Sequence, residues 1–436
     1  MAEVRPFPGM HYNGSMINDL AAVICPPYDI IPPRQQQELH LRNEYNCVRL
    51  EFGRELPQDT TTDNKYTRAA ATQEQWLKQG ILQIDETPAV YLHDHYFTHR
   101  GKEYKRRGLI AAIRLEEWDR MVIRPHEGTM MAPKSDRLSL LWALQANTSP
   151  ILTLYEDSQQ RIASLLATQQ QGQPLLSSRK LDGERHDVWV IKAPDVVNQI
   201  SSSFAGQPLY IADGHHRYES ALNYQRERRA CSPSASEDEP FNFVMMTLVS
   251  FSDPGLLILP THRLVRGIPK ATLDGLMTKL KLFFDIDELP IDSPDDWKHV
   301  DDLLTGTNKI RLALFGLTTR HLLVLTLCDP AQVNPMMPNF HSDLYKRLAV
   351  SIADHVILEK LLTLSSDSEK ANLTYTDDRV DAINRVVSQE YQLALLLSPA
   401  RAEAIKAIAD VGDKMPRKST YFYPKLPAGL VFHRLV

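Results

Sequence analysis

The chain has 436 residues, of which 43% are hydrophobic and 24% charged, the balance of a globular protein of roughly two to four domains. Its net charge of −5 gives no electrostatic reason to expect DNA, RNA or a membrane surface as a partner, and no apolar run is as long as a bilayer span. The first residues lack the apolar core of a signal peptide, and the few cysteines are too far apart for a zinc knuckle or a disulfide scaffold, so we expect a cytoplasmic protein.

Proline interrupts the first predicted strand. Residues 22–25 are apolar and β-prone, and the Pro26-Pro27-Tyr28-Asp29 run after them cannot continue a sheet ladder, which predicts an ordered loop at a strand end. Residues 46–52 alternate like a second strand and carry Arg49 and Glu51. A solvated strand face is the plainer interpretation of these two charges, and a place in a ligand site is the alternative. An amphipathic helix over 64–79 and a hairpin with strands 89–97 and 103–115 follow.

Two histidines, His93 and His95, would share one face of the first hairpin strand. A metal ion needs at least one further ligand, and the neighbouring sequence offers none. A metal site is therefore the minor interpretation of this pair.

Several reactive residue types gather in the loop 124–129, Arg-Pro-His-Glu-Gly-Thr, before a helix opened by Lys134, Asp136 and Arg137. Loops bounded by proline and glycine carry function more often than cores do. The carboxylate of Glu127 could take a proton from a hydroxyl if burial tunes its pKa. Capping of its own helix is the alternative role for Glu127.

The most crowded stretch is Asp213–Glu219, Asp-Gly-His-His-Arg-Tyr-Glu. It stands where the short apolar strand 208–212 ends and a helix over 220–226 follows. At such a junction backbone N–H groups and the positive end of the helix dipole point outwards, where an anion can bind. Gly214 lets the backbone approach a ligand, and the imidazoles and guanidinium after it are donors suited to phosphate. A plain Asp-Gly turn that caps the helix is the alternative, although it needs only one or two such residues.

The C-terminal half is regular except at two polar stretches. Strands 243–249 and 256–259 are predicted to pair, and Pro260-Thr261-His262-Arg263 at their end could join the anion site or face solvent. Residues 269–329 indicate a small accessory α+β segment. The tail Met415–Lys425 interleaves lysines and hydroxyls with aromatic rings, which suits the base and phosphates of a nucleotide. A strap of rings packed on the core is the alternative.

Five stretches occur in order: Cys25–Asp29 (CPPYD), His126–Thr129 (HEGT), Asp213–Glu219 (DGHHRYE), Pro260–Arg263 (PTHR) and Lys418–Lys425 (KSTYFYPK). With them the chain resembles, over nearly its full length, a bacterial and archaeal family known as a domain of unknown function. The path from His126-Glu127 through Ser149-Pro150-Ile151 to Arg217 is similar to the core of the ParB/sulfiredoxin-like superfamily. The nearest resemblance there is to the free-serine kinases, which use a nucleotide to phosphorylate the hydroxyl of L-serine. The resemblance implies an α+β fold with a mixed-sheet core and helices.

The resemblance also implies roles for individual residues. Glu127, beside His126, corresponds to the carboxylate that activates the serine hydroxyl, and Asp213 lies near Mg²⁺ or the transferred group. The predicted contacts to ATP or ADP are Gly214, His215, His216, Arg217, Arg263, Lys418, Ser419 and Lys425. The predicted substrate contacts are Asp29, Arg49, Thr129 and His262.

The resemblance leaves the substrate open, because the insertion between Ile151 and Asp213 is much longer than the kinases carry. Superfamily members also use the phosphate loop for cysteine-sulfinate repair or as a nucleotide switch in DNA segregation. No cysteine lies beside this loop, and the acidic composition argues against a DNA-linked role. We predict a Mg²⁺-dependent small-molecule kinase acting on serine or a similar hydroxy compound. The alternatives are a nucleotide-binding switch with slow hydrolysis and a phosphatase acting on a phosphorylated small molecule.

Four regions are expected along the chain: an N-terminal α+β region (1–120), a ParB/sulfiredoxin-like nucleotide-binding core (121–266), an accessory α+β subdomain (267–335) and a C-terminal helical region whose tail returns to the site (336–436). The sequence leaves homodimer formation open.

Overall fold

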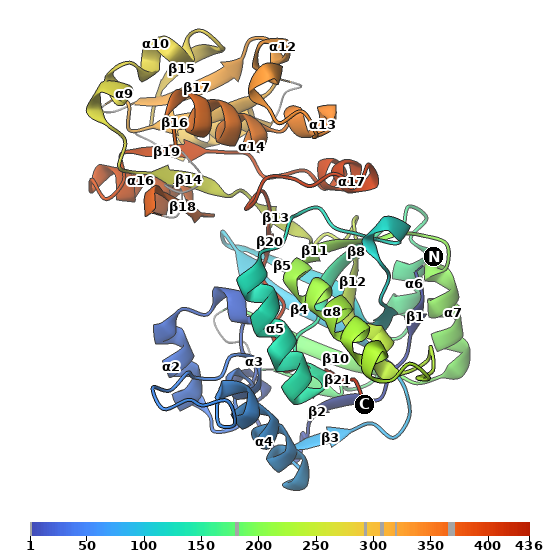
Figure 1. Ribbon diagram of the computed structural model, residues 1–436. Coiled ribbons are helices and arrows are strands. Elements are labelled where there is room, and N and C mark those ends of the chain that lie inside the picture. Colours follow the sequence, from blue (N-terminus) through green and yellow to red (C-terminus); the bar gives the residue numbers. More distant parts are fainter. Residues whose placement is uncertain (1, 179–182, 292–293, 306–308, 319–320, 365–370) are drawn as a thin grey trace. The chain divides into compact units, whose positions relative to one another are not determined.

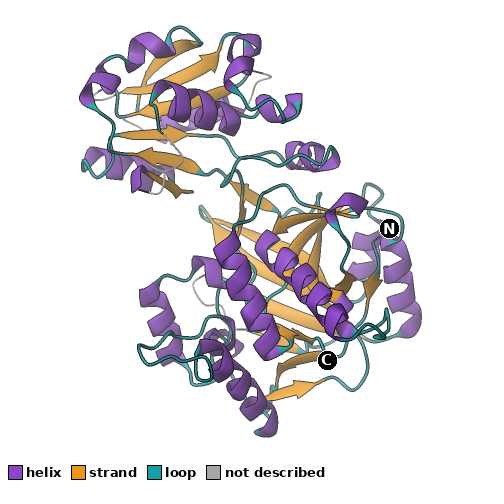
Figure 2. Cartoon of the chain, viewed as in Figure 1, coloured by secondary structure: helices purple, strands orange, loops and turns teal. Residues whose placement is uncertain are grey.

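The chain forms two compact units (Figure 1), and the computed structural model describes residues 2–178, 183–291, 294–305, 309–318, 321–364 and 371–436. The first unit comprises Met1–Pro125, Thr129–Leu257 and Pro424–Val436, and the second comprises His126–Gly128 and Ile258–Tyr423. Each unit contains both helices and a sheet (Figure 2), so the predicted α+β class is confirmed. The four-region division stays a prediction. In the part of the chain that is described, no helix is both long enough and apolar enough to cross a membrane.

A mixed sheet organises the first unit. Over the described residues it has nine strands in the order β6-β11-β8-β12-β5-β4-β10-β9, with β1 paired to β5. Strand β11 runs parallel to β6 and β12 parallel to β8, whereas the other neighbours are antiparallel. The strands are β1 Val4–Arg5, β4 Val90–His99, β5 Lys102–Arg114, β6 Ile123–Arg124, β8 Ile151–Tyr155, β9 Leu176–Ser177, β10 Arg185–Ile191, β11 Leu209–Asp213 and β12 Phe243–Ser250.

Both faces of this sheet are buried. Side chains alternate between the faces of a strand, and along β5 Ile110 and Ala112 enter one apolar core while Leu109, Ala111 and Ile113 enter another. Two-sided burial explains why several strands are continuous apolar runs in the sequence. The helices of this unit are α1 Leu20–Val23, α2 Pro33–Arg42, α3 Val48–Glu51, α4 Lys65–Lys78, α5 Met131–Leu144, α6 Arg161–Ala167, α7 Pro194–Phe204 and α8 His215–Cys231. Helices α5 and α8 lie side by side (Figure 1).

A small antiparallel sheet joins the two ends of the chain within the first unit. Its order is β3-β2-β21-β7, and the N-terminal β2 pairs with the C-terminal β21 through Gly9 and His433. These strands are β2 Gly9–Tyr12, β3 Leu82–Ile84, β7 Ala146–Asn147 and β21 Phe432–Arg434. Short 3-10 turns lie at Tyr28–Ile30 (η1), Trp118–Arg120 (η2) and Pro240–Asn242 (η3).

An antiparallel sheet organises the second unit, in the order β15-β17-β16-β19-β14-β18. Its strands are β14 His262–Val265, β15 Phe284–Pro290, β16 Arg311–Phe315, β17 His321–Leu327, β18 Leu373–Thr376 and β19 Leu393–Leu396, while β13 Leu257–Leu259 pairs with β20 Tyr421–Tyr423. The helices are α9 Lys270–Asp274, α10 Leu276–Leu280, α11 Pro294–Thr305, α12 Pro330–Val333, α13 Asp343–Lys346, α14 Ala349–Ser351, α16 Arg379–Val387 and α17 Ala402–Asp410. A 3-10 turn, η4 Asn334–Met336, and a π-helix, η5 Ile352–Leu361, complete the unit.

The elements with a strong local signal are confirmed, including α4, the β4–β5 hairpin and the β11–α8 junction. The strand predicted over 46–52 is wrong, because α3 lies there. The Asn46 side chain accepts the Val48 N–H at 3.0 Å and donates to the Ala22 carbonyl at 2.8 Å, which starts a helical turn. The strand predicted at 22–25 is likewise wrong, since α1 ends at Val23.

The predicted pairing of strands 243–249 and 256–259 is also wrong. Strand β12 has β8 on one side and β5 on the other, so it has no edge left for β13. Residues 260–263 do follow the end of strand β13, but His262 and Arg263 already belong to the buried strand β14. The helix predicted over 341–364 is divided into α13, α14 and η5.

The turn after β12 tests this packing, because Gly255 lies against the backbone of β5. A Cβ at Gly255 would lie 2.4 Å from the Lys105 carbonyl oxygen and 2.5 Å from the Arg106 nitrogen. We expect Gly255→Ala to lower the free energy of unfolding by about 1–3 kcal/mol in denaturant titrations. Gly14→Ala is the control, because nothing lies within 4 Å of its Cβ. Equal stability of the two variants would contradict this packing.

Candidate functional site

The Asp-Gly turn forms the end of β11 and the start of α8. Asp213 is the last residue of the strand, and Gly214 has a φ of +96°, in the left-handed region that favours glycine. The N-cap residue of α8 is Gly214, which has no side chain to cap the helix. The first-turn N–H groups and the helix dipole therefore make this turn a place where an anion can bind, as the sequence indicates.

Two cations share the carboxylate of Asp213. Arg217 donates to Oδ2 at 2.7 Å, and the Lys425 ammonium donates to Oδ1. Burial alone would raise the pKa of Asp213, but Lys425 and Arg217 outweigh it and hold that pKa well below its ordinary value. The carboxylate is therefore ionised at neutral pH, and it positions two of the predicted phosphate ligands.

The loop that follows Gly128 is fastened to the first turns of α8. Thr129 donates its hydroxyl hydrogen to Glu219, which also accepts from Lys134 at 2.7 Å. The backbone N–H of Met130 donates to Nε2 of His216 at 2.9 Å. A neutral His216 that accepts this N–H carries its proton on Nδ1.

A buried polar chain leads away from Arg217. Its Nη1 donates to Ser149 Oγ at 3.3 Å, and that hydroxyl donates to Oε1 of Glu51 at 3.1 Å. Glu51 is 1% exposed, so a solvated strand face is the wrong interpretation of this residue. Arg137 donates to the Glu51 carbonyl at 2.9 Å and lies over the Tyr28 ring, 4.0 Å from its centroid.

These hydrogen bonds, together with the contact of Arg137 with the Tyr28 ring, connect the Pro-Pro-Tyr-Asp motif with the Asp-Gly turn. Burial raises the pKa of Tyr28 to about 12, so its hydroxyl stays protonated. A cavity of about 30 Å³, room for one or two waters, is lined by Glu51, Arg137, Ser149, Arg217 and apolar neighbours. The resemblance joins Ser149 and Arg217, but no local pattern adds Glu51 and Arg137, because the contacts of Glu51 with Arg137 and Ser149 span 86 and 98 positions.

Two predicted substrate contacts lie elsewhere on the first unit. Asp29 is exposed in η1, and the Arg49 guanidinium donates to the carbonyls of His40 at 2.8 Å and Glu44 at 2.7 Å. Their assignment to a substrate stays a prediction.

In the second unit, the His-Glu motif lies against the tail. The Met415 N–H donates to the His126 carbonyl at 2.8 Å, and Glu127 forms a parallel β-bridge with Met415. The Thr420 hydroxyl lies 2.9 Å from Nε2 of the buried His126 and 3.4 Å from Oε1 of Glu127. Two motifs almost 300 positions apart in sequence therefore orient one carboxylate.

The remaining predicted ligands of the second unit have varied surroundings. Arg263 is fully buried and donates to Asp354 at 3.0 Å and to the Arg417 carbonyl at 3.3 Å. The His262 ring accepts the Leu397 N–H at 3.2 Å. Ser419 is buried and Lys418 exposed.

A larger hollow in the second unit has the size of a small-molecule site. Its volume is about 470 Å³, and Ser419 and Thr261 line it together with Arg311, Arg347 and Arg401. Three guanidinium groups at its wall favour an anionic occupant.

The stability of the polar chain can be tested at Asp136, which fixes Arg137. Burial by itself would raise the pKa of Asp136, but Arg137 and Lys65 lower it to about 2. A carboxyl group whose pKa is lowered by folding stabilises the folded protein. This stabilisation is fully present above the pKa of the group in the unfolded chain, near 4, and is lost as pH falls through about 2. We expect Asp136→Asn to cost roughly 2 kcal/mol at pH 7 and progressively less below about pH 4.

Urea unfolding at several pH values measures this difference. The exposed carboxylate of Asp63 provides the control, because Asp63→Asn should change stability little at any pH. If Asp136→Asn lowers the free energy of unfolding by the same amount from pH 7 to pH 3, the lowered pKa of Asp136 is not the source of this stability.

The chain belongs to the family described as "Protein of unknown function (DUF1015)", whose model matches residues 4–350. This confirms the resemblance to a family of unknown function. No curated protein sequence matches the chain.

Several solved structures align with the chain at low similarity. A conserved hypothetical protein from Pyrococcus furiosus is 12% identical, with 74% of this chain and 95% of that chain covered and a TM-score of 0.35. A free serine kinase in complex with AMP is 12% identical, with coverages of 74% and 91% and a TM-score of 0.34. SbnI with C-terminal truncation from Staphylococcus aureus is 10% identical, with coverages of 72% and 84% and a TM-score of 0.35. At these TM-scores the alignments carry no argument about fold or activity.

Proposed function

We propose that this member of the DUF1015 family is a nucleotide-dependent phosphotransferase that acts on the hydroxyl of a small, serine-like molecule. The observation that carries the proposal is the turn after β11, which combines a left-handed glycine, a helix N-terminus and two cations held by Asp213. Phosphoryl transfer needs positioning, charge neutralisation and a base. The turn can supply the first two.

In this proposal the first turn of α8 binds the phosphates of ATP or ADP through backbone N–H groups. Arg217 and Lys425 are already held at the turn by Asp213, so a phosphate can take over their hydrogen bonds with little reorganisation. Mg²⁺ is bound in proteins by one or two ionised carboxylates beside phosphate oxygens, and Asp213 fits that role. The bound ion would supply charge neutralisation at the phosphates.

Glu127 is the proposed base. Glu127 stands three residues before Met130, whose N–H binds His216 in the turn. His126 and Thr420 fix its side chain, which can then accept the proton of a substrate hydroxyl.

A transfer assay tests the role of Glu127. The protein is incubated with ATP or ADP, Mg²⁺ and a panel of hydroxy amino acids, and the phosphorylated acceptor is measured. Removing a general base costs about 10²–10⁴-fold in rate, so Glu127→Gln should lose transfer by that factor while nucleotide affinity stays unchanged. Nucleotide binding without transfer would support a switch, and phosphate release from phosphoserine without nucleotide would support a phosphatase. Either outcome would contradict the kinase.

Nucleotide affinity tests the turn itself. A Cβ at Gly214 would lie 3.0 Å from the Arg217 guanidinium, at a φ that side chains rarely adopt. We expect Gly214→Ala to weaken ADP binding at least about tenfold in calorimetry, because the strained turn misplaces Arg217. Gly80→Ala is the matched control, since Gly80 also has a positive φ (+72°) but nothing lies within 4 Å of its Cβ. If both variants bind ADP like the parent, phosphates do not bind at this turn.

A further inference from the structure

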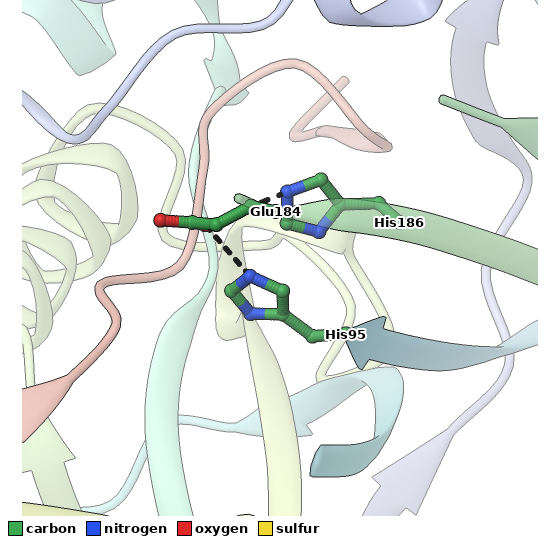
Figure 3. Close-up of side chains that lie close together, drawn as sticks. All are labelled: His95, Glu184 and His186. Atoms are coloured by element: carbon green, nitrogen blue, oxygen red, sulfur yellow. Dashed lines mark hydrogen bonds and ion pairs between the residues drawn. The ribbon is translucent and has the colours of Figure 1, made fainter. Parts of the chain in front are cut away.

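A cluster of imidazoles lies on one face of the first unit's sheet, between β4 and β10. His93 and His95 are two residues apart on β4, so their side chains point to the same face of the sheet. The register places His186 of β10 directly opposite His95. Glu184, two positions before His186, extends its side chain towards both rings (Figure 3). The third ligand that the sequence near His93 and His95 does not offer therefore comes from about 90 positions away.

The geometry of the cluster is close to that of a metal site. One ligand atom from each of His95, Glu184 and His186 lies within 4.8 Å of the others. Oε2 of Glu184 is 2.7 Å from Nε2 of His95 and 3.9 Å from Nε2 of His186. These separations straddle the roughly 3.3 Å edge of a tetrahedron with metal–ligand bonds of about 2.0–2.1 Å. Small side-chain rotations would bring the three atoms onto one ion.

His93 lies next to the His186 ring. Nδ1 of His186 lies 3.1 Å from Nε2 of His93. If Nδ1 donates its proton there, the Nε2 lone pair of His186 faces Glu184, and His93 orients the ring as outer partners of metal ligands do.

Arg106 opposes a cation at this position. Its Nη2 donates to Nδ1 of His95 at 3.1 Å and to the Pro424 carbonyl at 2.8 Å. For Nε2 of His95 to bind a metal, its proton must move to Nδ1. Nδ1 then no longer accepts from Arg106, whereas the hydrogen bond from Arg106 to the Pro424 carbonyl remains. The loss of one hydrogen bond is small beside the free energy of binding Zn²⁺ to protein ligands.

We propose that His95, Glu184 and His186 bind a divalent transition-metal ion, Zn²⁺, with a further coordination position open to water or a substrate oxygen. Two imidazoles and one carboxylate form a set that holds zinc in catalytic sites, where an open position is the rule. This site is independent of the Mg²⁺ proposed at Asp213, and it does not require phosphotransferase activity.

Metal binding to the full-length protein tests the site. After removal of metals with a chelator, Zn²⁺ is titrated against a competing indicator, and Co²⁺ absorption reports the coordination geometry. We expect one ion per chain with submicromolar affinity. Glu184→Gln, an isosteric change at a partly exposed residue, should weaken binding more than about 100-fold, and His186→Ala should do the same. Arg106→Gln should tighten binding about tenfold or more, because it removes a buried positive charge.

His299→Ala is the matched control for binding by surface histidines, since His299 is exposed on α11 of the second unit, and it should leave affinity unchanged. The proposal is wrong if the parent protein binds no Zn²⁺ at micromolar concentration. It is also wrong if Glu184→Gln binds one ion as tightly as the parent. Weaker binding in Arg106→Gln would point to an anion in this cluster and would equally overturn the metal assignment.

Discussion

The partly buried carboxylate of Asp213, shared by Arg217 and Lys425, is the interaction on which the rest of the first unit's site depends. The bond to Arg217 ties the end of β11 to the first turn of α8, and the bond to Lys425 ties the C-terminal segment to the same point. Buried ion pairs add little net stability, yet removal of one partner costs about 3–5 kcal/mol because it leaves an uncompensated charge. Such an arrangement is more readily explained by a ligand that uses the cations than by stability.

Consecutive residues of the C-terminal segment connect the two proposed sites of the first unit. The Pro424 carbonyl accepts from Arg106 of the histidine cluster, and the Lys425 ammonium binds Asp213 of the turn. Arg217 of the turn also donates to the Ser149 hydroxyl, which in turn donates to Glu51. The polar residues of this unit thus form a connected system, although they are spread along the chain from Glu51 to Lys425.

The parts of the fold that sequence predicts well are those with a local cause. The apolar strand, the Asp-Gly turn and the helix after Gly214 follow one another directly, so neighbouring residues define the junction. The alternation of residues 46–52 predicts a strand, whereas their helical turn depends on the hydrogen bond from Asn46 to the Ala22 carbonyl, a contact that no local pattern encodes. His186 joins His95 only through the register of β10 on β4, which depends on the whole sheet. The roles of Glu127 and of the tail residues stay predictions, since they depend on a ligand.

The most direct test of the central claim is a crystal structure of the protein with ADP and Mg²⁺. The account predicts phosphate oxygens within about 3 Å of the backbone N–H groups that follow Gly214, with Arg217 and Lys425 turned towards them. ADP bound instead in the 470 Å³ hollow beside Arg347 and Arg401, with the Asp213 ion pairs undisturbed, would contradict it.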